Sequence, residues 1–461
     1  MIILGTNSIK ATGFDVANSV RFDTNAYMHK TPGSAGSLTT WTFSTWIKRA
    51  KLGSSQNIFT SRNDGQNQTF AYFNSDDTVI FFDIDSNADQ GKLITNRKFR
   101  DVGAWYNLTF IWNTTSGTAG DRIQLWVNGV RETSFSTQTN PDQNDASTMG
   151  DAHIIEVGRG GEDENYANFY MAETVYQNNS ATTPVDKFGE YDTDSGIWKP
   201  INVSGLTFGN NSFYLDFENS AELGTDASGN SHTFTENNIA ATDQSTDTCT
   251  NNFCTMNPNL GALYTPTFTQ GNLQVAQSTN NQHAVTHGTF AVTKGVWYWE
   301  VKYIGNTGSS GPSDRAVGIQ VPNVSNVLTQ ATYNSNGSIT YYGYDGGEVW
   351  DEGTATSADY GTYSQNSILG ISLDMDNSHI SFYINGTEVV DNYALGDYAS
   401  VIATPAISWP NGTASGTEMG VNFGSPFYAL SSAVADANGY GSFEYTPVGY
   451  ALCTKNLAEY G

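Results

Sequence analysis

Basic residues are scarce in this chain. Its 461 residues include 20 Lys and Arg against 46 Asp and Glu, which gives a formal net charge of −26 at pH 7. A phosphate polymer must be met by clustered positive side chains, and the sequence contains no such cluster. The composition therefore predicts no nucleic-acid partner, and we interpret the acidity as a means of staying soluble in salty water.

Cysteines and long apolar runs are also few. The three cysteines, Cys249, Cys254 and Cys453, cannot build a disulfide framework. A local bridge between the first two stays open beside the interpretation as free thiols in a reducing cytosol. The apolar start over residues 1–4 is too short for a signal-peptide core, and no stretch reaches the length of a membrane helix. We expect a protein made in a cytoplasm and not inserted in a membrane.

One pattern occurs twice in the chain. In residues 122–131 (RIQLWVNGVR) and 378–388 (SHISFYINGTE), a predicted strand of alternating apolar and polar residues is followed by Asn-Gly. This dipeptide between alternating runs is a strong hairpin signal, because Asn and Gly reach the positive φ of a type I′ turn at low cost. Another strand precedes each copy, at residues 105–112 and 367–374. The repeat predicts two β-sandwiches in tandem.

Length and composition agree with this organisation. The chain suits two domains of roughly 200 residues each. Abundant Thr, Ser, Asn and Gly with 13% aromatic residues favour many short strands, so we predict an all-β fold. Residues 221–262 are polar with few apolar side chains, which indicates a linker between a sandwich over 1–220 and a second over 263–461 with a C-terminal extension.

The motifs of each half are similar to known families. In the first half they are 41–48 (WTFSTWIK), 105–110 (WYNLTF), 125–129 (LWVNG) and 155–159 (IEVGR) leading to 171–173 (MAE). These resemble the laminin G-like, concanavalin A-like lectin/glucanase jelly roll. In the second half they are 295–302 (GVWYWEVK), 373–376 (LDMD), 380–386 (ISFYING), 405–409 (PAISW) and 421–424 (VNFG). These resemble a SPRY domain, so the resemblance implies two tandem concanavalin A-like β-sandwiches.

The combination of the two halves is informative. Together with residues 188–192 (FGEYD) and 453–457 (CTKNL), it resembles the lectin-like virion proteins of marine bacteriophages. The resemblance implies a virion structural protein, a tail fibre or capsid fibre, that is made in the host cytoplasm and attaches to the host surface. Its expected partners are other virion proteins, a host cell-surface glycan and further copies of itself. The alternatives are an architectural decoration protein without glycan binding and, more remotely, a polysaccharide depolymerase.

Catalytic side chains are not indicated. A glucanase on the first fold would need two or three carboxylates on one strand at Glu-x-Asp-x-x-Glu spacing, and the sequence contains no such group. The acidic pairs at 83–85 (DID) and 374–376 (DMD) occur where a strand runs into a polar loop, so we interpret them as solvated. We predict that the protein is not an enzyme.

The most suggestive binding feature is a stretch of aromatic and acidic residues: Tyr341, Tyr342, Tyr344, Asp345 and Trp350. Aromatic rings stack on the apolar faces of sugars, and carboxylates accept hydrogen bonds from hydroxyls. These five residues form the predicted carbohydrate site. The alternative is a Gly-turned hairpin whose rings alternate into the core.

A tight acidic loop is formed by Glu162, Asp163 and Glu164. Carboxylate and carbonyl oxygens bind Ca²⁺, so this loop is the one metal-site candidate, with a solvated loop as the alternative. No other cofactor is predicted.

Overall fold

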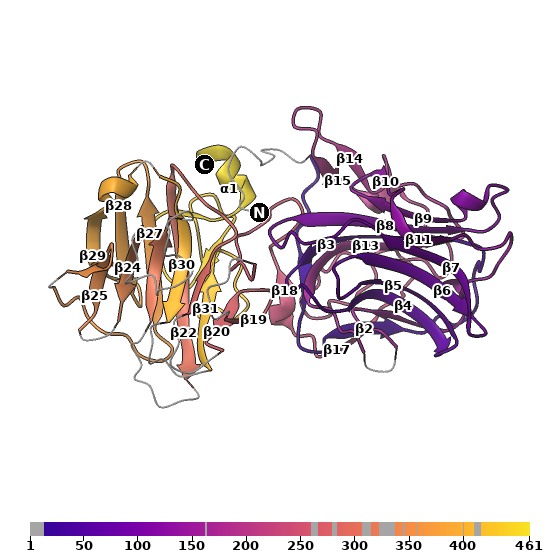
Figure 1. Cartoon of the computed structure of the whole chain (residues 1–461), viewed down its shortest axis with the longest axis horizontal. Coiled ribbons are helices and arrows are strands. Elements are labelled where there is room, and N and C mark those ends of the chain that lie inside the picture. Colours follow the sequence, from indigo (N-terminus) through magenta and orange to yellow (C-terminus); the bar gives the residue numbers. More distant parts are fainter. Residues whose placement is uncertain are drawn as a thin grey trace. The chain divides into compact units, whose positions relative to one another are not determined.

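The computed structural model describes residues 13–161, 164–259, 266–278, 284–306, 315–321, 337–343, 346–356, 358–399, 401–409 and 416–461. Within these ranges the protein is almost entirely β, and its single α-helix is α1 (Thr454–Tyr460). In the same ranges no helix is long and apolar enough to cross a membrane. The chain divides into two compact units. The first domain covers Ala11–Asn251, and the second includes Asn252–Gly461 (Figure 1). The predicted fold class, tandem β-sandwiches, is confirmed.

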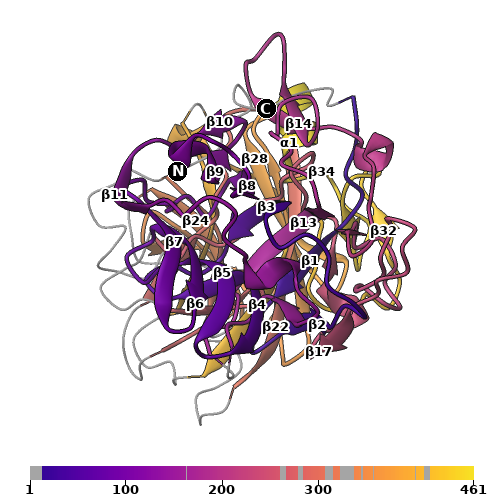
Figure 2. The same ribbon diagram turned by 90° about the vertical axis from the view of Figure 1, so that its right-hand side faces the viewer.

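The first domain stacks two sheets. Sheet one has the order β10 (Val130–Arg131), β9 (Ile123–Val127), β8 (Trp105–Asn113), β3 (Thr40–Arg49), β13 (Phe169–Asn178), β1 (Ser19–Phe22), β18 (Gln244–Ser245), and β16 (Phe213–Leu215) also pairs with β13. Sheet two has the order β11 (Phe135–Thr139), β7 (Ala88–Thr95), β6 (Val79–Asp85), β5 (Asn67–Phe73), β4 (Gln56–Asp64), β12 (Ile154–Val157), β2 (Tyr27–Lys30), β17 (Thr235–Asn237). In Figure 2, β5 and β6 of sheet two lie beneath β3 and β13 of sheet one.

Aromatic side chains fill the space between these sheets. On β3, the alternating residues Trp41, Phe43 and Ile47 are fully buried, and the Phe43 ring lies 4.3 Å from the ring of Phe59 on β4, measured between centroids. The outer face of sheet one is covered as well, by a later segment that contains the hairpin of β14 (Gly189–Tyr191) and β15 (Trp198–Pro200). Burial on both faces explains why nearly every residue of β3 and β13 is buried.

The stretch predicted to be a linker, 221–262, belongs mostly to the first domain. Its β17 pairs with β2 at one edge of sheet two, and its β18 pairs with β1 at one edge of sheet one. Phe234 lies in the core, and Asp247 is buried beside Lys48. The domain boundary therefore lies after Asn251, and the linker prediction is wrong because polar contacts, rather than a run of apolar residues, hold this segment.

The second domain also stacks two sheets. Sheet three has the order β19 (Thr267–Thr269), β20 (Gln274–Ala276), β31 (Thr417–Asn422), β22 (Val296–Asn306), β27 (Ile368–Asp374), β28 (His379–Ile384), β29 (Thr387–Ala394), and β34 (Tyr450–Ala451) pairs in parallel with β22. Sheet four has the order β21 (Ala284–His287), β30 (Thr404–Trp409), β23 (Ala316–Gln320), β24 (Ser338–Tyr342), β25 (Glu348–Asp351), β26 (Thr354–Ala355). The buried indoles of Trp297, Trp299 and Trp409 dominate the core between them.

The C-terminal segment covers the outer face of sheet three. It includes the ribbon of β32 (Val434–Ala435) and β33 (Ser442–Phe443) and continues through β34 into α1. Phe443 packs edge-on against Tyr298 of β22, with ring centroids 5.0 Å apart. Both domains thus cover the outer face of one sheet with sequence that follows the central strands of that sheet in the chain.

Both predicted Asn-Gly hairpins are confirmed. The turn at 128–129 joins β9 to β10, and the turn at 385–386 joins β28 to β29. In each turn the Asn has a φ of 49° and the Gly a φ of 75°. The Asn side-chain oxygen accepts a hydrogen bond from the preceding strand, from the backbone N–H of Asn107 at 2.8 Å and of Ile368 at 2.9 Å. The two turns are therefore built alike.

An aromatic ring from the covering segment lies on the glycine of each turn. A Cβ added at Gly129 would come within 2.4 Å of the Trp198 ring, and one at Gly386 within 2.5 Å of the Tyr445 ring. Glycine is thus required at these positions for two reasons: the backbone has a positive φ, and the ring occupies the space that a Cβ would need.

All three cysteines are free thiols, and Cys254 and Cys453 are buried. Cys249 and Cys254 therefore do not form the disulfide that the sequence left open.

Candidate functional site

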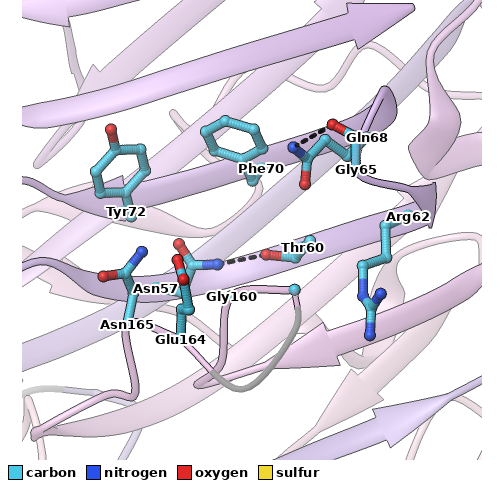
Figure 3. A pocket seen from close by; sticks show the side chains of 11 residues that line it. Asn57, Thr60, Arg62, Gly65, Gln68, Phe70, Tyr72, Gly160, Glu164 and Asn165 are labelled. Atoms are coloured by element: carbon cyan, nitrogen blue, oxygen red, sulfur yellow. Dashed lines mark hydrogen bonds between the residues drawn. The ribbon is translucent and has the colours of Figure 1, made fainter. Parts of the chain in front are cut away.

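A hollow of about 260 Å³ lies over β4 and β5 on the outer face of sheet two. Strand β5 alternates, so Ala71 and Phe73 enter the core while Phe70 and Tyr72 stay half-buried on the outer face. The hollow combines ring, amide and charged side chains. Its lining residues are Asn57, Thr60, Arg62, Gly65, Gln68, Phe70, Tyr72, Gly160, Gly161, Glu164 and Asn165 (Figure 3).

The strand register assembles the floor of the hollow. Antiparallel pairing of β4 with β5 sets three cross-strand pairs side by side: Asn57 with Tyr72, Thr60 with Phe70, and Arg62 with Gln68. Cross-strand partners on one face of a sheet are close enough for their side chains to touch. Each pair thus joins a polar side chain of β4 to a ring or an amide of β5.

The rings form a continuous apolar shelf. The centroids of Phe70 and Tyr72 are 5.6 Å apart, and Phe82 of β6 meets Phe70 edge-on at 5.2 Å. The Lys92 ammonium lies 4.1 Å from the Phe82 centroid. Burial, with Asp76 nearby, raises the pKa of Tyr72, so its phenol stays neutral and can both donate and accept hydrogen bonds. The shelf offers aromatic surface beside hydroxyl chemistry.

Polar groups face this shelf from the other side. Figure 3 shows Asn57, Thr60 and Glu164 opposite the rings. The Asn57 side-chain amide donates to the Thr60 hydroxyl, and the Asn57 backbone N–H donates to the Asn165 carbonyl at 2.8 Å. The Gly160 N–H donates to the Glu164 carbonyl at 2.9 Å, which closes the loop that forms this wall. Side-chain amides and a carboxylate are thus held within reach of a bound hydroxyl-rich ligand.

One end of the hollow carries an ion-pair cluster. Glu156 of β12 is fully buried and accepts from Arg62 at 3.3 Å and from Arg159 Nε at 3.0 Å. The Arg159 guanidinium stacks on the Tyr27 ring, 3.6 Å from its centroid. Glu156 lies outside the lining of the hollow, and among the described lining residues Glu164 is the one carboxylate.

The predicted carbohydrate site of the second domain is not assembled as expected, because Tyr341 points into the core. Its side chain is fully buried and its ring lies 5.6 Å from that of Phe382, between centroids. Its hydroxyl donates to the Gly361 carbonyl. Tyr341 therefore cannot stack on a ligand, and for this residue the alternative of a core position is confirmed.

Tyr342 and Trp350 lie on the opposite face of β24 and β25. Their rings meet edge-on with centroids 6.2 Å apart, and the Trp350 indole N–H donates to Glu348 at 3.0 Å. Tyr344 and Asp345 lie outside the described residues. Two of the five predicted residues are thus placed together, and their part in ligand binding stays a prediction.

The predicted calcium loop is described only at Glu164, since Glu162 and Asp163 lie outside the described residues. Glu164 is exposed at the rim of the hollow. In the part of the chain that the structure describes, no group of three or more His, Cys, Asp or Glu could hold a metal ion. Glu164 thus lines the hollow, and the prediction of a calcium loop did not anticipate this position.

The residues of the hollow were missed because their functional pattern is split between distant segments. A local signal was nevertheless present in residues 69–73 (TFAYF), which place aromatic side chains on both faces of one strand. One face of such a strand builds the core, and the rings on the other face remain available for a ligand.

Family models match both domains. Residues 22–182 match the concanavalin A-like lectin/glucanases superfamily, and residues 296–423 match the SPRY domain. The chain carries a concanavalin A-like domain followed by a SPRY domain. The hollow lies within the concanavalin A-like match, and Tyr342 and Trp350 lie within the SPRY match. The predicted order of the two families is confirmed.

Solved structures resemble parts of the chain. The SPRY domain of human HERC1 is 14% identical over 36% of this chain and 96% of its own, with a TM-score of 0.30. A heptameric SAP-like pentraxin from Limulus polyphemus is 16% identical over 44% and 96%, with a TM-score of 0.30. A putative carbohydrate binding protein from Bacteroides ovatus is 13% identical over 49% and 60%, with a TM-score of 0.31. A comparison with curated proteins gives no match. These similarities carry no argument about function.

Proposed function

We propose that this chain is a non-enzymatic attachment protein of a bacteriophage particle, a tail fibre or capsid fibre, whose concanavalin A-like domain binds a host-surface glycan in the hollow over β4 and β5. The observation that supports glycan binding is the aromatic shelf of Phe70 and Tyr72, set opposite the amide of Asn57 and the carboxylate of Glu164. The virion assignment rests on the resemblance of the domain order to phage virion proteins.

The chemistry of the hollow suits a sugar. The C–H face of a pyranose can stack on Phe70 or Tyr72, while its hydroxyls hydrogen-bond to Asn57, Gln68 and Glu164. The volume of about 260 Å³ lies just below the ~300–1,000 Å³ of sites for drug-sized ligands, so a short sugar segment fits better than a long one. Weak binding of this kind becomes effective when several copies act together on one particle.

Charge favours a neutral or amine-bearing glycan. The chain has a net charge of −26, and the carboxylate of Glu164 lies at the rim of the hollow. An acidic sugar would meet this repulsion, although Arg62 is present at the other end, already paired with Glu156. A single carboxylate among the described lining residues supports binding rather than cleavage.

The test is glycan binding by the full chain and by a Phe70→Ala/Tyr72→Ala double variant. Removing both rings takes away the stacking surface, so we expect binding to extracted host-surface glycan to fall by at least about tenfold, or ~1.4 kcal/mol. Tyr191→Ala serves as the control, because it removes an exposed tyrosine of the same domain outside the hollow. Thermal unfolding checks that the variants fold.

Other outcomes would select another function. Full binding by a folded double variant would remove the hollow from the proposal. Failure of the wild-type protein to bind any host-surface material would favour an architectural decoration protein. Oligosaccharides released from the extract would favour a depolymerase.

A further inference from the structure

A lysine and an aspartate are buried together in the first domain. Lys48 lies on the outer face of β3, and Asp247 follows the short strand β18, 199 residues later. The ammonium nitrogen of Lys48 is 2.7 Å from Oδ2 of Asp247, and the two side chains are only 1% and 2% exposed. The pair therefore lies away from bulk water.

The surroundings of the pair are mostly aromatic. The Trp105 indole N–H donates to the other carboxylate oxygen, Oδ1 of Asp247, at 3.2 Å. The ring of Tyr170 lies 5.7 Å from the Lys48 nitrogen, measured to its centroid. Trp105 and Tyr170 form an apolar cluster with Trp46 and with Trp198 of the covering segment. Arg21 of β1, also fully buried, pairs with Tyr170 from the side opposite Lys48. Two opposite charges thus face each other away from bulk water, with a further positive charge beyond Tyr170.

Amide formation begins with a proton transfer within the pair. The nucleophilic form of a lysine is the neutral amine, and transfer of one proton across the 2.7 Å hydrogen bond from the Lys48 nitrogen to Oδ2 of Asp247 supplies it together with a neutral acid. Because the C–O bond is about 1.2 Å long, the Lys48 nitrogen lies within roughly 4 Å of the Asp247 Cγ, close to the 3–3.5 Å of a near-attack arrangement.

We propose that Lys48 and Asp247 condense to an intramolecular amide that cross-links the first domain. The neutral Lys48 nitrogen attacks Cγ, and the electron pair of the C=O bond moves to Oδ1, where the Trp105 N–H stabilises the negative charge. Collapse of this intermediate breaks the bond from Cγ to the protonated Oδ2. The hydroxyl leaves with one proton from the nitrogen as water, so one C–N bond forms, one C–O bond breaks and no oxidant is needed.

The cross-link would tie the central strand β3 to the last segment of the first domain. The segment after β18 is held mainly by short strand pairings and polar contacts. An amide at this point closes a loop of nearly the whole domain, which restricts its unfolded state in the way a disulfide does. It would also hold the domain closed under a pulling force.

The decisive measurement is the intact mass of the full chain under denaturing conditions. We expect the wild-type mass to lie below the mass calculated from its sequence by one water molecule. Tandem mass spectrometry of a digest should assign the loss to a branched peptide that joins Lys48 and Asp247. A wild-type chain that keeps its full calculated mass after long incubation in the folded state would overturn the proposal, as would a loss assigned to other residues.

Variants of Lys48, Asp247 and Trp105 test the cross-link independently, because each should change the mass loss or its rate in a different way. Lys48→Arg keeps a buried cation but has no primary amine, so it should show the full mass whether or not it folds. Asp247→Asn offers ammonia in place of water as the leaving group, so its loss should change to the mass of ammonia. Trp105→Phe should slow the appearance of the branched peptide in freshly refolded protein, and an unchanged rate would remove Trp105 from the step.

Discussion

Glu173 and Glu300 make the two domains directly comparable. Each is a buried glutamate on an interior strand, β13 in the first domain and β22 in the second. Glu300 accepts from the backbone N–H groups of Glu444 and Tyr445, both at 2.9 Å, in the covering segment. Glu173 accepts one described hydrogen bond, from the Tyr214 hydroxyl at 2.8 Å.

The difference in donors sets the charge state that each site favours. Burial raises the pKa of Glu300, but the two backbone N–H groups oppose this by stabilising the carboxylate. At Glu173 burial raises the pKa to about 8, and nearby Asp216 and Glu218 add to the effect. A β-bulge also places Glu173 at a φ of 46°. A buried acid can therefore fasten a covering segment only where that segment supplies donors in return.

Truncation at the domain boundary should have a larger effect on folding than any single substitution in either domain. Fragments 11–251 and 252–461 should each unfold cooperatively in calorimetry. A fragment that ends at residue 220 lacks β17, β18 and Phe234, and one that starts at 263 lacks the buried Phe253 and Met256, so both should lose their cooperative transition. Equal stability of the long and short first-domain fragments would contradict the boundary.

Removal of the Glu300 carboxylate should cost the second domain about 3 kcal/mol of unfolding free energy, because Glu300→Ala leaves buried N–H donors of the covering segment unpaired. Denaturant unfolding of the second-domain fragment measures the loss. Glu459→Ala, which removes an exposed glutamate from α1, is the control and should change little. A similar loss in both variants would mean that Glu300 does not fasten the segment.

The two Asn-Gly turns should respond alike. Gly129→Val and Gly386→Val should each destabilise their own domain by about 1–3 kcal/mol through strain at positive φ, and by more where the Trp198 or Tyr445 ring must move. Thermal unfolding with a probe in each domain measures this. Gly196→Val and Gly439→Val are matched controls, since both glycines have positive φ and open space around them. Controls that cost as much as the turn variants would rule out the ring contact.

The stability of the first domain should fall as the pH rises. The pKa values of Glu173 and Asp83 are raised by burial to about 8 and about 7, above their ordinary 4.5 and 3.8. Over the interval between the ordinary and raised values, the folded state holds protons that the unfolded chain has released, so each rise in pH favours unfolding. We expect a loss of about 3–4 kcal/mol between pH 6 and 8, of which Glu173 contributes the larger part.

Variants of the two acids test the source of this loss. Glu173→Gln and Asp83→Asn should each flatten the pH dependence of unfolding measured by denaturant titration at several pH values. Glu222→Gln changes an exposed glutamate of the same domain and should leave the slope as it is. A slope that survives the Glu173→Gln/Asp83→Asn double variant would place its origin in other groups.

The two candidate binding faces, one in each domain, should differ slightly in how much each contributes to adsorption. Trp350→Ala removes a half-buried ring of the second domain, and Tyr72→Ala removes one from the hollow of the first. Adsorption of labelled protein to host cells should fall less for Trp350→Ala than for Tyr72→Ala. The reverse order would move the main glycan site to the SPRY domain.

The sequence predicted the elements that carry strong local signals. Asn-Gly between alternating strands predicted both turns, and the strands predicted before them at 105–112 and 367–374 are β8 and β27. The segment 221–251 gave no such signal, because β17 has three residues and β18 has two. Its core side chains Leu223 and Phe234 are isolated among polar residues. The hydrogen bonds that hold this segment join residues far apart in the chain, and no periodicity records them.

The candidate site was harder to predict for the same reason. Tyr341 and Tyr342 are adjacent in sequence, so they were grouped, yet alternation along β24 sends them to opposite faces. Asn57 and Tyr72 are distant in sequence, and only the register of β4 with β5 brings them together. Asp83 was interpreted as a solvated loop residue, but it lies two residues before the end of β6 and is fully buried beside Thr69.

The parallel pairing of β34 with β22 has a consequence for synthesis. Leu452 and Leu457 are buried in the core of the second domain, so that core cannot close until Leu457 has been translated. The first domain needs nothing after residue 251. At 5–20 residues per second, the 457 − 251 = 206 residues from there to Leu457 take roughly 10–40 s. The first domain can thus begin to fold well before the core of the second is complete, and the second depends on its unfolded strands staying soluble meanwhile.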